Sequence, residues 1–247
     1  MESKLKIAVY TVIIGPYDGL IPPPSYANID YICFTDQPFR SKKWQIRKVK
    51  IENNDPVRTA RKIKIQPHLY LPEYEHSVFV DGNYVIKKNL EILVKHVLQY
   101  GPMGIFDHNQ CSDPRNCVYD EYEAIIHLQN QRAKLKDDPA IMDQQMMQYR
   151  KEGYPEKNGL IFSAALVRQH HHPKVKETMK CWWQQIEQFS KRDQLGFNYA
   201  AWKTNFQPYY ISGDLRRHEY FHLLSKHRPD YRWKYLKYRL KRIIGLI

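Results

Sequence analysis

The chain has 247 residues, of which 43% are hydrophobic and 26% are charged, a balance typical of a globular protein with a sizeable core. No apolar run approaches the ~20 residues of a membrane-spanning helix, so we expect the body of the protein to be soluble. Lys and Arg outnumber Asp and Glu by 39 to 26, which gives a net charge of +13 and favours anionic partners such as phosphate groups, nucleic acid or acidic lipids.

The cysteines and the N-terminus predict a cytoplasmic protein. The four cysteines form no Cys-x-x-Cys pair and no metal-ligand spacing, and such sparse usage suits a reducing compartment. The first ten residues, MESKLKIAVY, enter a strand-like run within five residues, which leaves no room for the hydrophobic region of a signal peptide. The four thiols that we expect to be free are Cys33, Cys111, Cys117 and Cys181.

Short β-branched or aromatic runs alternate with helical patterns along the chain. The predicted strands are 6–14, 30–35, 44–49, 77–81, 103–107, 159–167 and 207–212. Apolar residues recur at helical spacing in 90–98 and 175–189. This alternation predicts an α/β fold with a mostly parallel sheet. Because no long linker or repeat interrupts the chain, we expect one domain over 1–227 and a tail over 228–247.

The tail reads as a basic amphipathic helix. It carries seven basic residues against one acid, and its apolar residues recur at helical spacing. Such a helix can attach a protein peripherally to the inner, anionic face of a membrane. Packing of the helix on its own body explains the pattern equally well. The apolar positions are Trp233, Leu236, Leu240, Ile243 and Ile247.

The stretch SVFVDGN (77–83) ends an apolar strand in a carboxylate, a glycine and an amide. Ligands of open α/β sheets bind where parallel strands end, so Asp81 is placed for ligand binding. Gly82 permits a tight turn, after which Asn83 offers a second oxygen to a hard divalent cation held by phosphates. A simple strand-ending turn of the same residues is the alternative.

A basic segment, DPVRTARKIKIQPH (55–68), lies just upstream of this turn. On a helix, Arg58, Arg61 and Lys62 fall on neighbouring faces suited to a diphosphate, and Lys64 follows. A solvated basic face is the other interpretation. Neither GxxxxGK[ST] nor GxGxxG occurs, which argues against a Walker-type phosphoryl transferase.

Several segments resemble a plant and bacterial glycosyltransferase-like domain family that includes plant pectin (rhamnogalacturonan) galacturonosyltransferases, and they occur in the order that the family has. They span almost the whole body of the chain, and FSKRDQLGF within the last is the most specific. The segments are YTVIIGPYD (10–18), DYICFTDQ (30–37), RTARKIKIQPH (58–68), SVFVDGN (77–83), CVYDEYEAI (117–125), NGLIFSAALVRQH (158–170) and WWQQIEQFSKRDQLGFNY (182–199).

The resemblance implies a GT-A-like, Rossmann-like domain that moves a sugar from a nucleotide diphosphate donor, UDP-linked, to a glycan or glycolipid hydroxyl in polysaccharide biosynthesis. Asp81 and Asn83 take the place of the family's acidic D-x-D turn, which holds Mn²⁺ or Mg²⁺ on the diphosphate. Since Asn83 is neutral, this turn binds metal more weakly than two carboxylates do. Arg58, Arg61 and Lys64 would then hold the diphosphate directly.

By the same resemblance, Asp193 and Gln194 in RDQLGF match the segment that retaining enzymes place against the transferred sugar. Asp193 would stabilise positive charge at the anomeric carbon, and Gln194 would orient sugar hydroxyls. An N-terminal helix cap is the alternative role for Asp193.

The resemblance also implies contacts for the nucleotide and for the acceptor. Such enzymes bind the base and ribose at the positions of Tyr10, Thr11 and Asp36. A buried Tyr and a turn-capping Asp without a ligand are the alternative interpretation of these residues. The acceptor side would comprise His108, Arg115, Arg168 and His170. For His170, followed by two more histidines, a surface cluster without a role is the alternative.

Two other classes of function remain open for this chain. His218-Glu219-Tyr220-Phe221-His222 spells HExxH, which on a helix binds zinc in a metal-dependent hydrolase; the family resemblance also reaches proteins labelled ceramidases. A basic polyanion-binding module is the third class. Nucleic-acid binding is not expected, because no recognised RNA- or DNA-binding signature appears.

Overall fold

The computed structural model describes residues 5–132, 137–224 and 230–245. Its centre is a seven-stranded sheet in the order β3-β2-β1-β4-β7-β6-β8. The strands are β1 (Ile7–Ile13), β2 (Ile29–Thr35), β3 (Gln45–Lys48), β4 (His76–Val80), β6 (Met103–Asp107), β7 (Ile161–Gln169) and β8 (Tyr209–Ile211). All seven predicted strands are confirmed, with ends that differ by at most two residues.

The sheet is parallel except at β7, which runs antiparallel to both of its neighbours, β4 and β6. The other six strands therefore end at one edge of the sheet, which we call the carboxyl edge, and β7 begins there. This arrangement confirms the predicted α/β class with a mostly parallel sheet.

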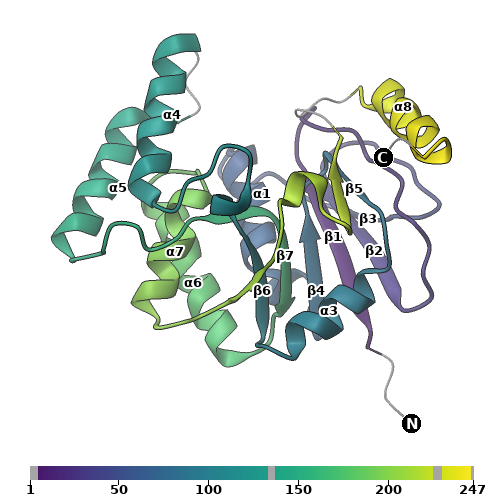
Figure 1. Cartoon of the computed structure of the whole chain (residues 1–247), viewed down its shortest axis with the longest axis horizontal. Coiled ribbons are helices and arrows are strands. Elements are labelled where there is room, and N and C mark those ends of the chain that lie inside the picture. The colour runs from purple at the N-terminus through teal and green to yellow at the C-terminus, as the bar shows by residue number, and fades with distance from the viewer. Residues whose placement is uncertain (1–4, 133–136, 225–229, 246–247) are drawn as a thin grey trace.

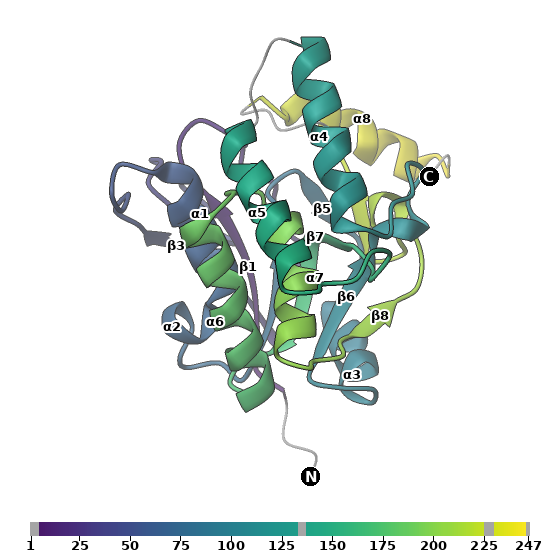
Figure 2. The ribbon, with the colours of Figure 1, turned by 90° about the vertical axis from the view of Figure 1, so that its left-hand side faces the viewer.

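Helices cover both faces of the sheet (Figures 1 and 2). One face packs against α1 (Pro56–Ile65), α6 (Pro173–Gln188) and α7 (Gln194–Lys203), and the short α2 (Pro67–Tyr70) follows α1. The other face packs against α3 (Leu90–Leu98). The predicted helical faces are confirmed, since Leu93 in α3 and Trp182 in α6 lie in these two cores.

Two further helices, α4 (Val118–Arg132) and α5 (Pro139–Lys151), lie beside α7 in Figure 2. Their apolar side chains form a separate core with α7. Within it, the rings of Tyr149 and Tyr199 stack with their centroids 3.9 Å apart. The aromatic contact ties α5 to the helix that begins after Asp193.

Two very short strands escape the sequence patterns. β5 (Tyr84–Ile86) and β9 (Phe221–Leu223) form an antiparallel pair beside the main sheet, and single-turn 3₁₀ helices occur at η1 (His108–Gln110) and η2 (Leu215–Arg217). The zinc interpretation of HExxH is therefore wrong: His218 lies in the extended segment after η2 and His222 in β9, so they do not share a helical face.

The predicted basic helix is present as α8 (Arg232–Ile243). The expected boundary between 227 and 228 and the terminal Ile247 lie outside the described residues, so the division into domain and tail stays a prediction. Among the described residues, no helix is both long and apolar enough to cross a membrane.

Candidate active site

Helix α1 carries a lysine into the core at the carboxyl edge. The helix begins after Asp55, whose side chain accepts a hydrogen bond from the Arg58 amide at 2.9 Å, and it ends just before Pro67. These limits place Lys64 in the last turn facing the sheet, and the residue is only 1% exposed. A buried ammonium needs close partners to offset its lost hydration.

Lys64 finds those partners on three other segments. Its Nζ lies 2.6 Å from Asp193 Oδ2 and 3.7 Å from Asp81 Oδ1, and it donates to Ser163 Oγ at 3.3 Å. The ammonium also lies 4.6 Å from the centre of the Phe79 ring. One buried cation thus joins α1, β4, β7 and the start of α7.

Asp193 is the most enclosed carboxylate of this cluster, at 3% exposure. Its Oδ2 accepts from Lys64 and from Ser163 Oγ at 2.9 Å, and lies 3.3 Å from Arg61 Nη1. Oδ1 takes part in none of these contacts. Although Asp193 precedes α7, its side chain makes no capping hydrogen bond. The helix-cap interpretation is therefore wrong.

The charges around Asp193 keep it ionised. Burial alone raises the pKa of this carboxyl, but the charges of Arg61 and Lys64, the hydrogen bond from Lys64 and the charge of Arg192 outweigh burial. The pKa of Asp193 is consequently held far below its usual value, so the group is ionised at neutral pH.

The turn that carries Asp193 is fixed by its neighbours. Asp137 Oδ2 accepts from Ser190 Oγ at 2.6 Å and from the Lys191 amide at 2.8 Å. On the other side, Trp182 Nε1 donates to the Asp193 carbonyl at 2.9 Å. The carboxylate is thus held in place before any ligand arrives.

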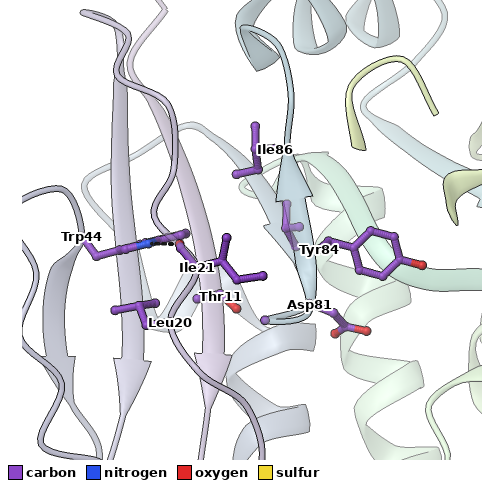
Figure 3. A pocket seen from close by; sticks show the side chains of 9 residues that line it. Thr11, Leu20, Ile21, Trp44, Asp81, Tyr84 and Ile86 are labelled. Carbon is purple, nitrogen blue, oxygen red and sulfur yellow. Dashed lines mark hydrogen bonds between the residues drawn. The ribbon is translucent and has the colours of Figure 1, made fainter. Parts of the chain in front are cut away.

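Asp81 is the more accessible carboxylate. It follows β4, and 24% of its side chain is exposed. In Figure 3 its carboxylate points away from Trp44 and Leu20. Asn83 is only 8% exposed, so Asp81 supplies the exposed oxygens of this turn. Among the described residues, no group of three His, Cys, Asp or Glu side chains could hold a metal ion by itself.

Two guanidinium groups at the cluster have unused donors. The Nε atoms of Arg61 and Arg192 are buried and have no hydrogen-bond partner among the residues that the structure describes. Tyr17, in the loop after β1, lies within electrostatic range of both guanidinium groups and of Asp81. Buried donors of this kind are uncommon unless a ligand or water completes them.

Sequence reasoning missed Ser163, Arg192 and Tyr17. Ser163 lies within an apolar strand, so no pattern marks it. Arg192 could have been found as the immediate neighbour of Asp193, and Tyr17 as part of the resembling segment 10–18. Predicted Gln194 lies next to the cluster, where its amide donates to the Ile161 carbonyl at 3.2 Å.

The prediction for Arg58 is wrong. Its guanidinium donates to the carbonyls of Ile186 and Phe189, at 2.9 and 2.8 Å, and to Asp55 Oδ2 at 2.9 Å. Nε and Nη2 join α1 to the end of α6, and Nη1 bonds to Asp55, which directly precedes α1. Arg58 therefore holds the fold rather than a diphosphate.

Tyr10, Arg168 and His170 are also not site residues. Tyr10 lies in the core and donates to the Lys64 carbonyl at 2.7 Å. Arg168 is buried against Tyr10 and the C-terminal end of α1, and His170 Nε2 contacts the Leu71 carbonyl at 3.2 Å. Because β7 is antiparallel, residues at its end lie at the edge opposite the cluster.

Thr11 and Asp36 do lie at the carboxyl edge. Thr11 lines a small pocket with Gly82, Ile21 and other residues shown in Figure 3. Its hydroxyl is buried and has no hydrogen-bond partner in the described part of the chain. Asp36 accepts from the Gly15 amide at 2.8 Å, which fixes the loop after β1. Contacts of both residues with a nucleotide stay predictions.

His108 and Arg115 lie together beyond the end of β6. Arg115 forms ion pairs with Glu121 at 2.7 Å and with Asp113 at 3.2 Å, and its Nη2 lies 3.3 Å from His108 Nε2. Burial and the Arg115 charge lower the pKa of His108 to about 4. The predicted pair is therefore a neutral imidazole beside a paired guanidinium, and its acceptor role stays a prediction.

Comparisons with known proteins found a family and a similar solved structure. A solved structure of the bifunctional glycosyltransferase WbbM, in its apo form, has a TM-score of 0.48 and 10% sequence identity; the match covers 86% of this chain and 39% of that one. The chain thus spans less than half of that neighbour. Comparison with curated proteins gave no match. The family model of the TOD1/MUCI70 glycosyltransferase-like domain matches residues 30–223, and the chain belongs to that family.

Proposed function

We propose that the protein transfers a sugar from a nucleotide diphosphate donor, UDP-linked, to a hydroxyl of a glycan or glycolipid. Family membership supports a glycosyltransferase. The cluster at the carboxyl edge supports the nature of the donor. The observation that carries the proposal is the buried Lys64 between Asp81 and Asp193, with the unused Nε donors of Arg61 and Arg192 beside it.

The diphosphate is the group that best suits these donors. Phosphate oxygens accept the charge-assisted hydrogen bonds that guanidinium groups offer, and these bonds are the stronger ones. Lys64, Arg61 and Arg192 outnumber the two carboxylates of the cluster, so an anion gains from binding here. The departing nucleotide diphosphate would be stabilised by the same charges.

Asp193 would act on the sugar itself. In the reaction, the bond between the anomeric carbon and the diphosphate oxygen breaks and the diphosphate leaves with the electron pair. The acceptor oxygen then bonds to that carbon and its proton is released. Positive charge develops at the anomeric carbon, and Asp193, kept ionised by its neighbours, would stabilise it through Oδ1. Gln194 would orient sugar hydroxyls, and we expect retention of configuration.

A divalent cation, Mn²⁺ or Mg²⁺, would arrive on the diphosphate. Asp81 fits this role because its carboxylate is partly exposed and Mg²⁺ commonly needs only one or two protein carboxylates beside substrate phosphates. Such a cation neutralises charge on the leaving group. Asn83 would contribute less, since it is largely buried.

The acceptor would approach from the side of His108 and Arg115, at the end of β6. We propose that the protein works in the cytoplasm.

A nucleotide-sugar panel tests the function: UDP-sugars should raise the melting temperature, Mn²⁺ should increase that shift, and Asp81→Asn should remove the Mn²⁺ increment. A response only to polyanions, abolished by salt, would instead indicate a basic binding module.

A further inference from the structure

Helix α8 docks on the body through one stripe of tyrosines. Tyr238 is buried against Ile21 and Val85, and its ring stacks on His222 with the centroids 4.8 Å apart. Tyr231 donates its hydroxyl to the Leu20 carbonyl at 2.7 Å. The helix therefore has a fixed orientation relative to the sheet.

The opposite stripe of α8 is apolar and exposed. At about 100° per residue, the outward residues lie across the helix axis from the docked tyrosines. Their exposed fractions are far above those of ordinary core residues: 71% for Trp233, 44% for Leu236, 53% for Leu240 and 75% for Ile243. A contiguous exposed apolar stripe is typical of an interaction surface.

Cations flank this stripe along both sides. Arg232 and Arg239 lie along one side of it, and Lys234, Lys237 and Lys241 along the other, all of them exposed. The helix sequence RWKYLKYRLKRI contains no acidic residue. An apolar stripe between two basic rows, with a Trp near its start, is the pattern of a helix lying in a membrane interface.

The same charges argue against a second copy of the chain as the occupant. Pairing two α8 stripes face to face would bring their basic rows together without an acidic residue to offset them, which is unfavourable. An anionic lipid surface offsets the charge and accepts the apolar side chains at once.

Helix α8 lies on the same side of the molecule as the candidate active site. Ile21 contacts Tyr238 and also lines the pocket that Asp81 and Thr11 line. Figures 1 and 2 both show α8 on the side where the parallel strands end. A surface touched by α8 would thus lie on the same side of the molecule as the cluster around Lys64.

We propose that the outward stripe of α8 docks the protein on an anionic lipid bilayer, with its carboxyl edge on the membrane side. The two sequence interpretations of this segment then hold together, because one stripe packs on the body and the other meets lipid. Resting on the proposed function, the acceptor class that this orientation fits is a lipid-linked glycan.

Co-sedimentation of the full chain with vesicles tests the docking without any sugar substrate. The protein should bind phosphatidylcholine vesicles that contain phosphatidylglycerol and should bind pure phosphatidylcholine far more weakly. Trp233→Ser/Leu240→Ser should abolish binding. The matched control, Leu69→Ser/Ile92→Ser, removes two similarly exposed apolar side chains from other helices and should bind like the wild type.

Two double variants, each of which removes two positive charges, complete the test. Lys237→Gln/Arg239→Gln should weaken vesicle affinity by roughly 30-fold, whereas Lys151→Gln/Lys180→Gln, with the same net charge but on α5 and α6, should change it little. Equal losses of vesicle affinity in the two charge variants would indicate non-specific electrostatic attraction. If the wild type is a dimer and Trp233→Ser/Leu240→Ser is not, the stripe binds a second copy of the chain. Either result overturns the proposal. Asp193→Asn should still bind vesicles, which separates this inference from the transferase function.

Discussion

Lys64 Nζ lies 2.6 Å from Asp193 Oδ2, and both side chains are almost completely buried. The two residues come from the end of α1 and the start of α7. Their pairing draws these helices onto the carboxyl edge of the sheet and leaves Asp81 as the accessible acid of the cluster. A single ion pair thus supports the fold and shapes the site.

Breaking this pair should destabilise the protein. Removing one partner of a buried ion pair typically costs about 3–5 kcal/mol, because the other charge is left uncompensated. We expect Lys64→Met and Asp193→Leu each to approach that cost, and the double variant to lose much less than the sum. Urea unfolding of all four proteins measures the coupling. Additive losses would show that the two residues do not act as a pair.

Asp193→Asn should abolish sugar transfer while UDP still raises the melting temperature. The amide keeps the size of the side chain but cannot oppose positive charge at the anomeric carbon. Transfer by single-turnover kinetics and UDP binding by thermal shift are the two readouts. Retained transfer would assign Asp193 a purely structural role.

Arg61→Gln should weaken UDP binding about tenfold or more, since it removes the guanidinium whose Nε donor has no hydrogen-bond partner among the described residues. Arg58→Gln is the matched control on the same helix. Its guanidinium is occupied by α6, so this change should lower the melting temperature and leave UDP affinity unchanged. Titration calorimetry compares them, and equal affinity losses would contradict the assignment of the two arginines.

Tyr10→Phe should affect stability alone. It removes a buried hydroxyl that bonds to the Lys64 carbonyl and to Arg168, at a cost of about 1–3 kcal/mol. UDP affinity should not change, because the side chain is completely buried and its hydroxyl bonds only within the core. A clear loss of UDP affinity in this variant would restore the nucleotide contact predicted from the sequence.

Stability should fall as the pH is lowered from about 6.5 toward 4. Burial lowers the pKa of His68 and of His108 to about 4 and that of His170 to about 3. In this window the unfolded chain binds protons that the folded chain does not, so the free energy of unfolding decreases. Unfolding in urea at several pH values should show a shallower slope for His170→Gln. An unchanged slope would contradict the neutral, buried state of this imidazole.

Much of the sheet follows from sequence periodicity, because each long strand is a compact apolar run bounded by turn residues. Asp81 was predicted from position, since a carboxylate that ends a parallel strand lies where ligands bind. The β5–β9 pair was not predicted because three residues such as YVI show no period and, unlike β8, do not lie within a longer strand-like run. Only their mutual pairing and their packing against the body define them.

Strand direction and long-range burial are the two features of the site that the sequence did not show. The resemblance implied that Arg168 and His170 lie on the acceptor side, but the antiparallel β7 carries its end to the opposite edge. Lys64 belongs to a run that usually forms a solvated face. Its burial depends on Asp193, 129 residues away in the chain, which local sequence cannot reveal.

The measurement that tests the central claim most directly is a crystal structure of the protein soaked with UDP and Mn²⁺. We expect the diphosphate at the carboxyl edge, with its oxygens within hydrogen-bond distance of Arg61 and Arg192 and with the cation against Asp81. Nucleotide bound at another surface, or a carboxyl edge without nucleotide at saturating UDP, would contradict the account.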